Sequence, residues 1–274
     1  MKNSILTIII LTVIFLSCTK SPDEEIAKNI NSITVFEYSA TEENGTIIRG
    51  NLDRKVVYNY DIKENLIKQI NYELGHNIEY KFSFIYDESE KMTEENFSYG
   101  DDIIRHRIIY TYNTAGYLTG ENFYGVNGSL LFRYEYTNDE KGNQTVSDYY
   151  NSEGKLSSRT TYNYDAKNNM IEMKYYNPAT FLSWRKTFTY NSMGKQTKEF
   201  IFDTFAETWS NKIIYEYDEK GNLTEQGHYG SDDIIGEKLT YKYLEFDKAG
   251  NWTIRNEYRN DLIFKISERE IEYF

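Results

Sequence analysis

The stretch YEYDEKGNLTEQ at residues 215–226 contains the pattern that decides the fold. Tyr215 and Tyr217 are two positions apart, so in an extended strand their side chains share one face. Asp218 and Gly221 form a turn signal, because an Asp side chain accepts bonds from nearby backbone N–H groups and glycine tolerates a left-handed backbone. The stretch therefore predicts a strand, a tight hairpin turn and the start of a second strand.

The same pattern recurs along the chain at a nearly constant spacing. The first five steps between residues equivalent to Asp218 are 26 residues long, and the last two are 27 and 29. A fixed period of roughly 20–50 residues is typical of repeat proteins. We call the equivalent residues the anchors, and each is expected to lie in a hairpin turn: Asp61, Asp87, Asn113, Asp139, Asp165, Asn191, Asp218 and Asp247.

Aromatic residues stand one and three positions before most anchors, with polar residues between them. This alternation predicts strands with an aromatic face and a wet face. Glycine or asparagine stands three positions after six of the anchors. The first two units have Glu64 and Glu90 there, so their turns are expected to be looser or of another type. A second polar break, such as YGDD at residues 99–102, closes the other end of each unit.

One unit therefore consists of two strands of roughly nine residues, each about 30 Å long. Residues 32–38 and the following break predict a leading hairpin, and IEYF at 271–274 predicts the last strand of an unfinished ninth unit. The expected fold is all-β: about eight 26-residue hairpins in a curled, antiparallel, single-layer sheet with aromatic residues on its inner face. A four-bladed propeller is the alternative. An outer-membrane barrel is disfavoured, because Glu270 and Glu272 alternate with Phe274 where lipid-facing strands need apolar residues.

The repeat resembles the YD repeat of the Rhs family, whose core reads roughly Tyr-Asp-x-x-Gly-(Arg/Asn)-Leu-Thr. The best unit matches it position by position: Tyr217, Asp218, Gly221, Asn222, Leu223 and Thr224. The similarity covers about residues 54–274. It implies a sheet that coils strand by strand. The chain is short and lacks the toxin module of large Rhs proteins, so the resemblance does not imply toxin delivery.

The N-terminus has the features of a secretory signal. Residues 4–17 form an apolar run behind the single charge of Lys2, and Cys18 follows directly. The end of the run, FLSC, resembles a bacterial lipobox, although Phe15 stands where leucine is favoured. Cys18 is the only cysteine of the chain. We expect a signal peptide over 1–17, lipidation at Cys18 and an outer-membrane location; an ordinary signal peptide with an incidental cysteine is the alternative.

Residues 18–31 are polar and are expected to form a tether before a repeat domain over 32–274. The acidic triplet at residues 23–25 fits either an export tag or a solvated linker. The chain of 274 residues carries 31 basic and 43 acidic side chains, and its charge without residues 1–17 is −13. Such a chain has no electrostatic footprint for nucleic acid and no basic face for anionic lipid, which leaves the lipid as its membrane signal.

No pattern of catalytic or metal-binding residues stands out in the sequence. His76, His106 and His228 fall in different units without ligand spacing, and the acidic pairs at 101–102 and 232–233 fit turns better than calcium sites. We therefore expect no enzyme activity, no cofactor and no metal.

The expected function is that of a membrane-anchored, non-enzymatic binding or scaffold module for a glycan or a protein segment. The Rhs resemblance suggests the alternative, an accessory protein of a secretion or contact-dependent toxin system. Whether the aromatic rows are core or binding face stays open at this point. The burial of Tyr58, Tyr110 and Tyr162 would distinguish the two.

Overall fold

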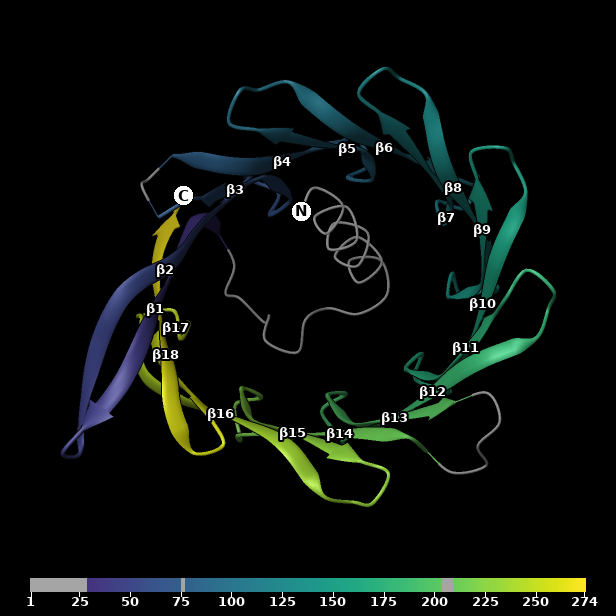
Figure 1. Ribbon diagram of the computed structural model, residues 1–274. Coiled ribbons are helices and arrows are strands. Elements are labelled where there is room, and N and C mark those ends of the chain that lie inside the picture. Colours follow the sequence, from purple (N-terminus) through teal and green to yellow (C-terminus); the bar gives the residue numbers. More distant parts are fainter. Residues whose placement is uncertain (1–28, 75–76, 204–208) are drawn as a thin grey trace.

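A computed structural model describes residues 29–74, 77–203 and 209–274, and all regular structure in these ranges is β (Figure 1). Eighteen strands form one sheet in which each strand pairs antiparallel with its neighbours. The strands are β1 (Ile30–Glu43), β2 (Thr46–Tyr60), β3 (Leu66–Tyr72), β4 (Ile78–Tyr86), β5 (Met92–Tyr99), β6 (Ile104–Tyr112), β7 (Leu118–Gly125), β8 (Leu130–Asn138), β9 (Gln144–Asn151), β10 (Leu156–Tyr164), β11 (Met170–Tyr176), β12 (Leu182–Tyr190), β13 (Gln196–Asp203), β14 (Asn211–Tyr217), β15 (Leu223–Gly230), β16 (Ile235–Phe246), β17 (Trp252–Arg259) and β18 (Leu262–Tyr273).

The sheet closes on itself and forms a barrel. Strand β1 pairs with β2 on one side and with β18 on the other, so that Ile33 lies opposite both Tyr58 and Ile271. The expected all-β, antiparallel structure is confirmed, but the open curled sheet and the four-bladed propeller are both wrong. Closure pairs the N–H and C=O groups that an open sheet would leave along its two edges.

The eight anchors lie in the turns at one end of the barrel, which we call the anchor rim. In each turn the residue three positions after the anchor donates its N–H to the anchor carbonyl and has a positive φ. At Asp218 the side chain also accepts bonds from the N–H groups of Lys220 and Asn222, at 2.9 and 2.8 Å. Glu64 and Glu90 adopt the same left-handed turn, with φ of 69° and 63°. The looser turns expected for these two units are therefore wrong, because the bonds to the anchor hold the turn without glycine.

Replacing Gly221 by valine is expected to destabilise the barrel by about 1–2 kcal/mol, because a β-branched side chain fits the left-handed region poorly. Gly221 has a φ of +84°, and an added Cβ would also approach Cε of Lys195 to 3.3 Å. Urea unfolding of Gly221→Val against the parent chain measures the loss. The matched control is Gly236→Val in β16, where an added Cβ meets only the His228 carbonyl, at 3.9 Å. An equal loss in both variants would contradict the turn geometry.

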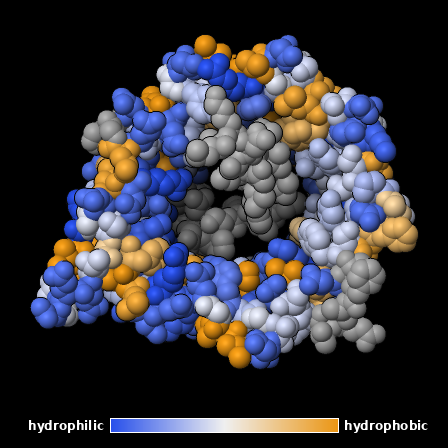
Figure 2. All heavy atoms as spheres, in the orientation of Figure 1, coloured by the Kyte–Doolittle hydropathy of each residue, from blue (hydrophilic) through white to orange (hydrophobic). Residues whose placement is uncertain are grey.

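The width of the barrel determines how its interior packs. Eighteen strands spaced about 4.8 Å apart enclose a ring at least about 28 Å across, so side chains cannot meet over the centre. Figure 2 shows the described residues as a ring of atoms around a central hollow, the lumen. Buried side chains therefore pack against neighbours on the same wall and form small clusters. Examples are Ile108 with Phe123, and Tyr162 with Met170 and Phe188.

Candidate functional site

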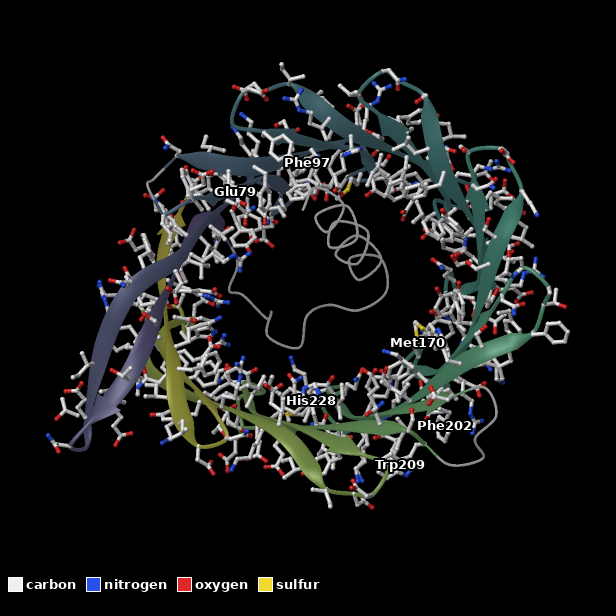
Figure 3. All side chains as sticks on the ribbon, in the orientation of Figure 1. Glu79, Phe97, Met170, Phe202, Trp209 and His228 are labelled. Atoms are coloured by element: carbon white, nitrogen blue, oxygen red, sulfur yellow. The ribbon has the colours of Figure 1, made fainter. Side chains whose placement is uncertain are left out.

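The aromatic rows predicted from the sequence line the lumen. In Figure 3 Phe97, Met170 and His228 point inward, whereas Phe202 and Trp209 point outward. Directly paired residues of neighbouring strands share a face, so the strand register assigns the remaining positions from these five. Seven of the eight residues three positions before the anchors face the lumen: Tyr58, Phe84, Tyr110, Tyr136, Tyr162, Phe188 and Tyr215.

The burial of these rows gives a mixed answer to the question of core or binding face. Tyr162 is 8% exposed, whereas Tyr58 and Tyr110 are only half-buried. Several other lumen-facing side chains are buried by their neighbours along the wall: Phe84, Phe97, Ile108, Phe123 and Phe188. The inner wall is therefore partly a core and partly a surface that a ligand in the lumen can touch.

The row next to the anchors is structural. Its tyrosines donate their hydroxyls to the main-chain carbonyl of the residue that starts the preceding odd strand, as Tyr190 does to Met170 O at 2.7 Å. Tyr86, Tyr112, Tyr164 and Tyr217 make the same bond, and Asn138 makes it with its amide. In the last unit Tyr243 takes this place, because a register shift accommodates three extra residues before Asp247. The 29-residue step seen in the sequence is this insertion.

Two buried glutamates lie among the aromatic rings. Glu95 and Glu121 are 4% and 3% exposed, and Glu95 accepts a hydrogen bond from Tyr110 at 3.2 Å. Glu121 accepts one from Tyr136. Burial raises the pKa of each carboxyl to about 7, against the lowering effect of its tyrosine partner. Sequence reasoning missed both residues, although their positions alternate with Phe97 and Phe123 and so place them on the aromatic face.

Half-buried aromatic rings line the lumen on several strands, such as Tyr80 and Phe82 on β4, and one such group lies on β8–β12. We call it the aromatic arc, and it consists of five half-buried side chains: Phe132, Tyr134, Tyr149, Tyr175 and Trp184. Tyr149 packs 5.2 Å from Tyr134, and Tyr175 stacks on Trp184 with the rings 5.3 Å apart and 3° from parallel. Between these two groups β10 places only the small hydroxyl side chains of Ser158 and Thr160. The arc thus offers flat ring faces with hydroxyl groups beside them.

The wall across the closing strands is charged. Glu257 on β17 accepts hydrogen bonds from Arg255 at 2.9 Å and from Ser267 at 2.6 Å. Lys265 lies 3.3 Å from Glu37, which also faces Arg54 at 3.7 Å. These polar contacts join β17, β18, β1 and β2 on the lumen side, and β17, β18 and β1 also share a buried apolar cluster of Ala40, Tyr258, Ile263 and Ile266.

The outer wall carries one cation in most hairpins, placed against an aromatic ring. Five such pairs have the charged group 4.1–5.7 Å from the ring centre: Lys55 with Tyr72, Arg107 with Tyr124, Arg133 with Tyr150, Arg185 with Phe202 and Lys212 with Tyr229. Carboxylates stand beside several of them, as Glu135 does 3.0 Å from Arg133. A lipid-facing wall needs an apolar band around the barrel. The charged side chains of these pairs are suited to water instead. In the described part of the chain, no helix is long and apolar enough to cross a membrane.

The other residues singled out in the sequence do not gather into one site. His106 lies on the inner wall 5.9 Å from the ring of Phe97, and burial lowers its pKa. His228 lies on β15, its Nε2 2.6 Å from Nε2 of Gln226, and His76 and Cys18 are outside the described residues. The acidic pairs occupy turns, where Asp101 pairs with Arg105, Asp102 with Lys81 and Asp233 with Lys212. Within the described ranges, no three His, Cys, Asp or Glu side chains gather as a metal site.

Comparison with known proteins gives structural likeness only. No family model and no curated protein matches the chain. A porin-like protein from Bacteroides uniformis is 12% identical with a TM-score of 0.46, and the match covers 90% of this chain and 99% of that one. The Tc holotoxin pore of Photorhabdus luminescens is 13% identical with a TM-score of 0.38; the match covers 91% of this chain but only 13% of the toxin chain.

A putative outer membrane lipoprotein-sorting protein domain from Vibrio parahaemolyticus is 8% identical with a TM-score of 0.25, and the match covers 92% of this chain and 87% of that one. All three identities are low and all three TM-scores are below 0.5, so we base no argument on these matches. The YD-repeat resemblance stays a prediction, although toxin-complex chains are among the structural neighbours.

Proposed function

We propose that the barrel is a non-enzymatic binding protein of the bacterial envelope and that the lumen is its ligand site. The observation that carries the proposal is the aromatic arc, whose five half-buried rings face a lumen too wide for side chains to fill. Accessible aromatic surface usually marks a contact, because leaving it in water costs free energy. The outer wall needs no lipid around it, which supports a water-facing binding barrel over a pore.

The composition of the arc favours a ligand with alternating apolar and hydroxyl-rich surface, and a neutral glycan chain fits best. Sugar rings present apolar faces that stack on aromatic rings, and their hydroxyls need donors and acceptors nearby. Half-buried Thr160 places such a group beside Tyr175, whereas Ser158, opposite Tyr149, is itself buried. An extended protein segment is the second candidate, because tyrosine-rich surfaces also bind peptides.

Trp184 allows a direct test of lumen binding. The chain has three tryptophans, of which Trp209 points outward and Trp252 is 5% exposed, so Trp184 is the one in the arc. We expect titration with neutral oligosaccharides of at least four units to change the tryptophan fluorescence saturably for at least one glycan. Trp184→Phe should abolish the change, and Trp209→Phe should leave it.

The outcomes separate the two candidates and the proposal itself. A saturable change with extended peptides alone would replace the glycan by a protein ligand. If the folded parent chain shows no saturable fluorescence change with either glycans or peptides, the lumen is not a binding site.

Anchoring through a lipid on Cys18 remains part of the proposal. It rests on the sequence: the FLSC motif and the single cysteine of the chain. Cys18→Ala is expected to release the protein from the membrane fraction or to leave it as unprocessed precursor, as measured by fractionation and mass spectrometry of the N-terminus. Normal maturation and equal membrane retention of the variant would contradict lipidation.

A further inference from the structure

The end of the barrel opposite the anchors, which we call the far rim, consists of the turns that join each odd strand to the next even one. Six residues in these turns or directly beside them are large apolar side chains that are 52–75% exposed: Leu74, Ile103, Val126, Phe181, Ile234 and Leu262. Turns usually carry glycine, asparagine, aspartate or serine, so the fold does not require apolar residues there. The anchor end of the barrel shows four such side chains in the described ranges: Ile62 and Met193 in turns, Leu244 near the end of β16 and Phe274 at the chain end.

Three carboxylates of the far-rim turns pair with strand lysines beneath these apolar tips. Asp102 pairs with Lys81, Asp233 with Lys212, and Asp261 with Lys238, the last at 2.6 Å. The cations come from the strands, and the carboxylates come from the same turns as the tips. Among the described residues, Glu73 and Asp232 beside the tips have no ion pair, so the rim keeps an acidic excess that disfavours an anionic surface over a zwitterionic one.

The spacing of the tips indicates what they contact. Tips of consecutive hairpins are two strands apart, or about 10 Å along the ring, with polar turn residues between them. Figure 2 shows hydrophobic residues scattered around the circumference and not gathered in one patch. A protein partner would have to match each separate point, whereas the headgroup boundary of a bilayer is planar and fluid and admits each tip independently.

We propose that the far rim docks on a zwitterionic phospholipid surface, with the apolar tips inserted at the headgroup boundary and the barrel axis along the bilayer normal. Both ends of the described chain lie at the other rim, where the Phe274 N–H donates to the Asn29 carbonyl at 3.0 Å, so neither obstructs this contact. The eleven Cα–Cα steps from Cys18 to Asn29 can span about 38 Å when extended. That exceeds the roughly 30 Å length of the nine-residue strands, such as β4 and β12, so a lipid on Cys18 and the far-rim turns of these hairpins can reach one membrane.

The test uses residues 19–274, which include every described strand and no lipidation site. We expect the protein to float with phosphatidylcholine vesicles in a density gradient, and to do so several-fold less when a third of the lipid is phosphatidylglycerol. The variant with Leu74, Val126, Phe181 and Leu262 all changed to serine should lose at least about tenfold in partitioning, because it buries far less apolar surface. The matched control changes Ile62 and Met193 of the anchor rim to serine and should partition like the parent chain.

Circular dichroism and thermal melts check that both variants are folded, and sedimentation velocity is run in parallel. Absence of flotation with phosphatidylcholine, or equal loss in the two variants, would overturn the proposal. So would a dimer of the parent chain that the four-serine variant dissociates, because the tips would then join two copies of the barrel. These results do not depend on the lumen ligand, whose binding is read from Trp184.

Discussion

The free energy of unfolding is expected to fall by on the order of 3 kcal/mol for a single buried glutamate as the pH rises from about 4.5 to above 7. Glu95 and Glu121 each have a pKa raised to about 7 by burial, from an ordinary value of 4.5. In this window the folded chain binds more protons than the unfolded one. The stabilising contribution of these two carboxyls is therefore fully present below pH 4.5 and is lost as they ionise. Mutual repulsion couples the two carboxyls, so their effects will not simply add.

Glu121→Gln isolates this effect, because glutamine keeps an acceptor for Tyr136 but cannot ionise. Its unfolding free energy, from urea titrations between pH 4.5 and 8, should decline less than that of the parent chain and exceed it at pH 8. Glu140→Gln removes an exposed turn carboxylate and is the matched control. His106 acts in the opposite direction, since its lowered pKa favours folding as the pH rises. Parallel curves for Glu121→Gln and the parent chain would contradict the burial of this carboxyl.

Truncation of Phe123 to alanine is expected to destabilise the barrel by about 3–5 kcal/mol, the range seen for buried phenylalanine. Phe123 is 8% exposed and packs with Ile108. Its ring lies 4.2 Å from that of Phe132 and 6.0 Å from that of Tyr134. Because the core of this wide barrel is one side chain deep, no second layer can move in to fill the space. Thermal and urea melts of Phe123→Ala measure the loss.

The control for this variant is Phe181→Ala, because Phe181 is 69% exposed at the far rim and should contribute almost nothing to stability. If Phe123→Ala melts like the parent chain, the inner wall is not the core. The aromatic rows would then be binding surface throughout, including the residues that the structure buries.

The local parts of the fold follow from short-range patterns in the sequence. Tyr215 and Tyr217 share a face because a strand alternates its side chains, and Asp218 with Gly221 forms the turn through contacts within four residues. Such relations are visible in any one unit. Glu64 shows their limit, since the bonds around Asp61 impose a left-handed backbone on a residue that disfavours it.

Closure could not be predicted in the same way. It depends on whether β18 returns to β1, a pairing of residues more than 200 positions apart, and hence on twist and stagger summed over every hairpin. The same holds for the aromatic arc. The repeat places a ring on the inner face of each unit, but whether neighbours bury it depends on side chains of adjacent units, as with buried Tyr162 and half-buried Tyr110.

Because the last strand pairs with the first, the diameter of the lumen depends on the number of hairpins and can change only by whole hairpins. A unit supplies two strands, so loss of one 26-residue unit would leave sixteen strands and a circumference smaller by about one-ninth, with both chain ends still at the same rim. Tandem gain or loss of whole hairpins would thus adapt the lumen of such barrels to ligands of different width. No new type of turn would be needed, and the surviving units would keep their contacts.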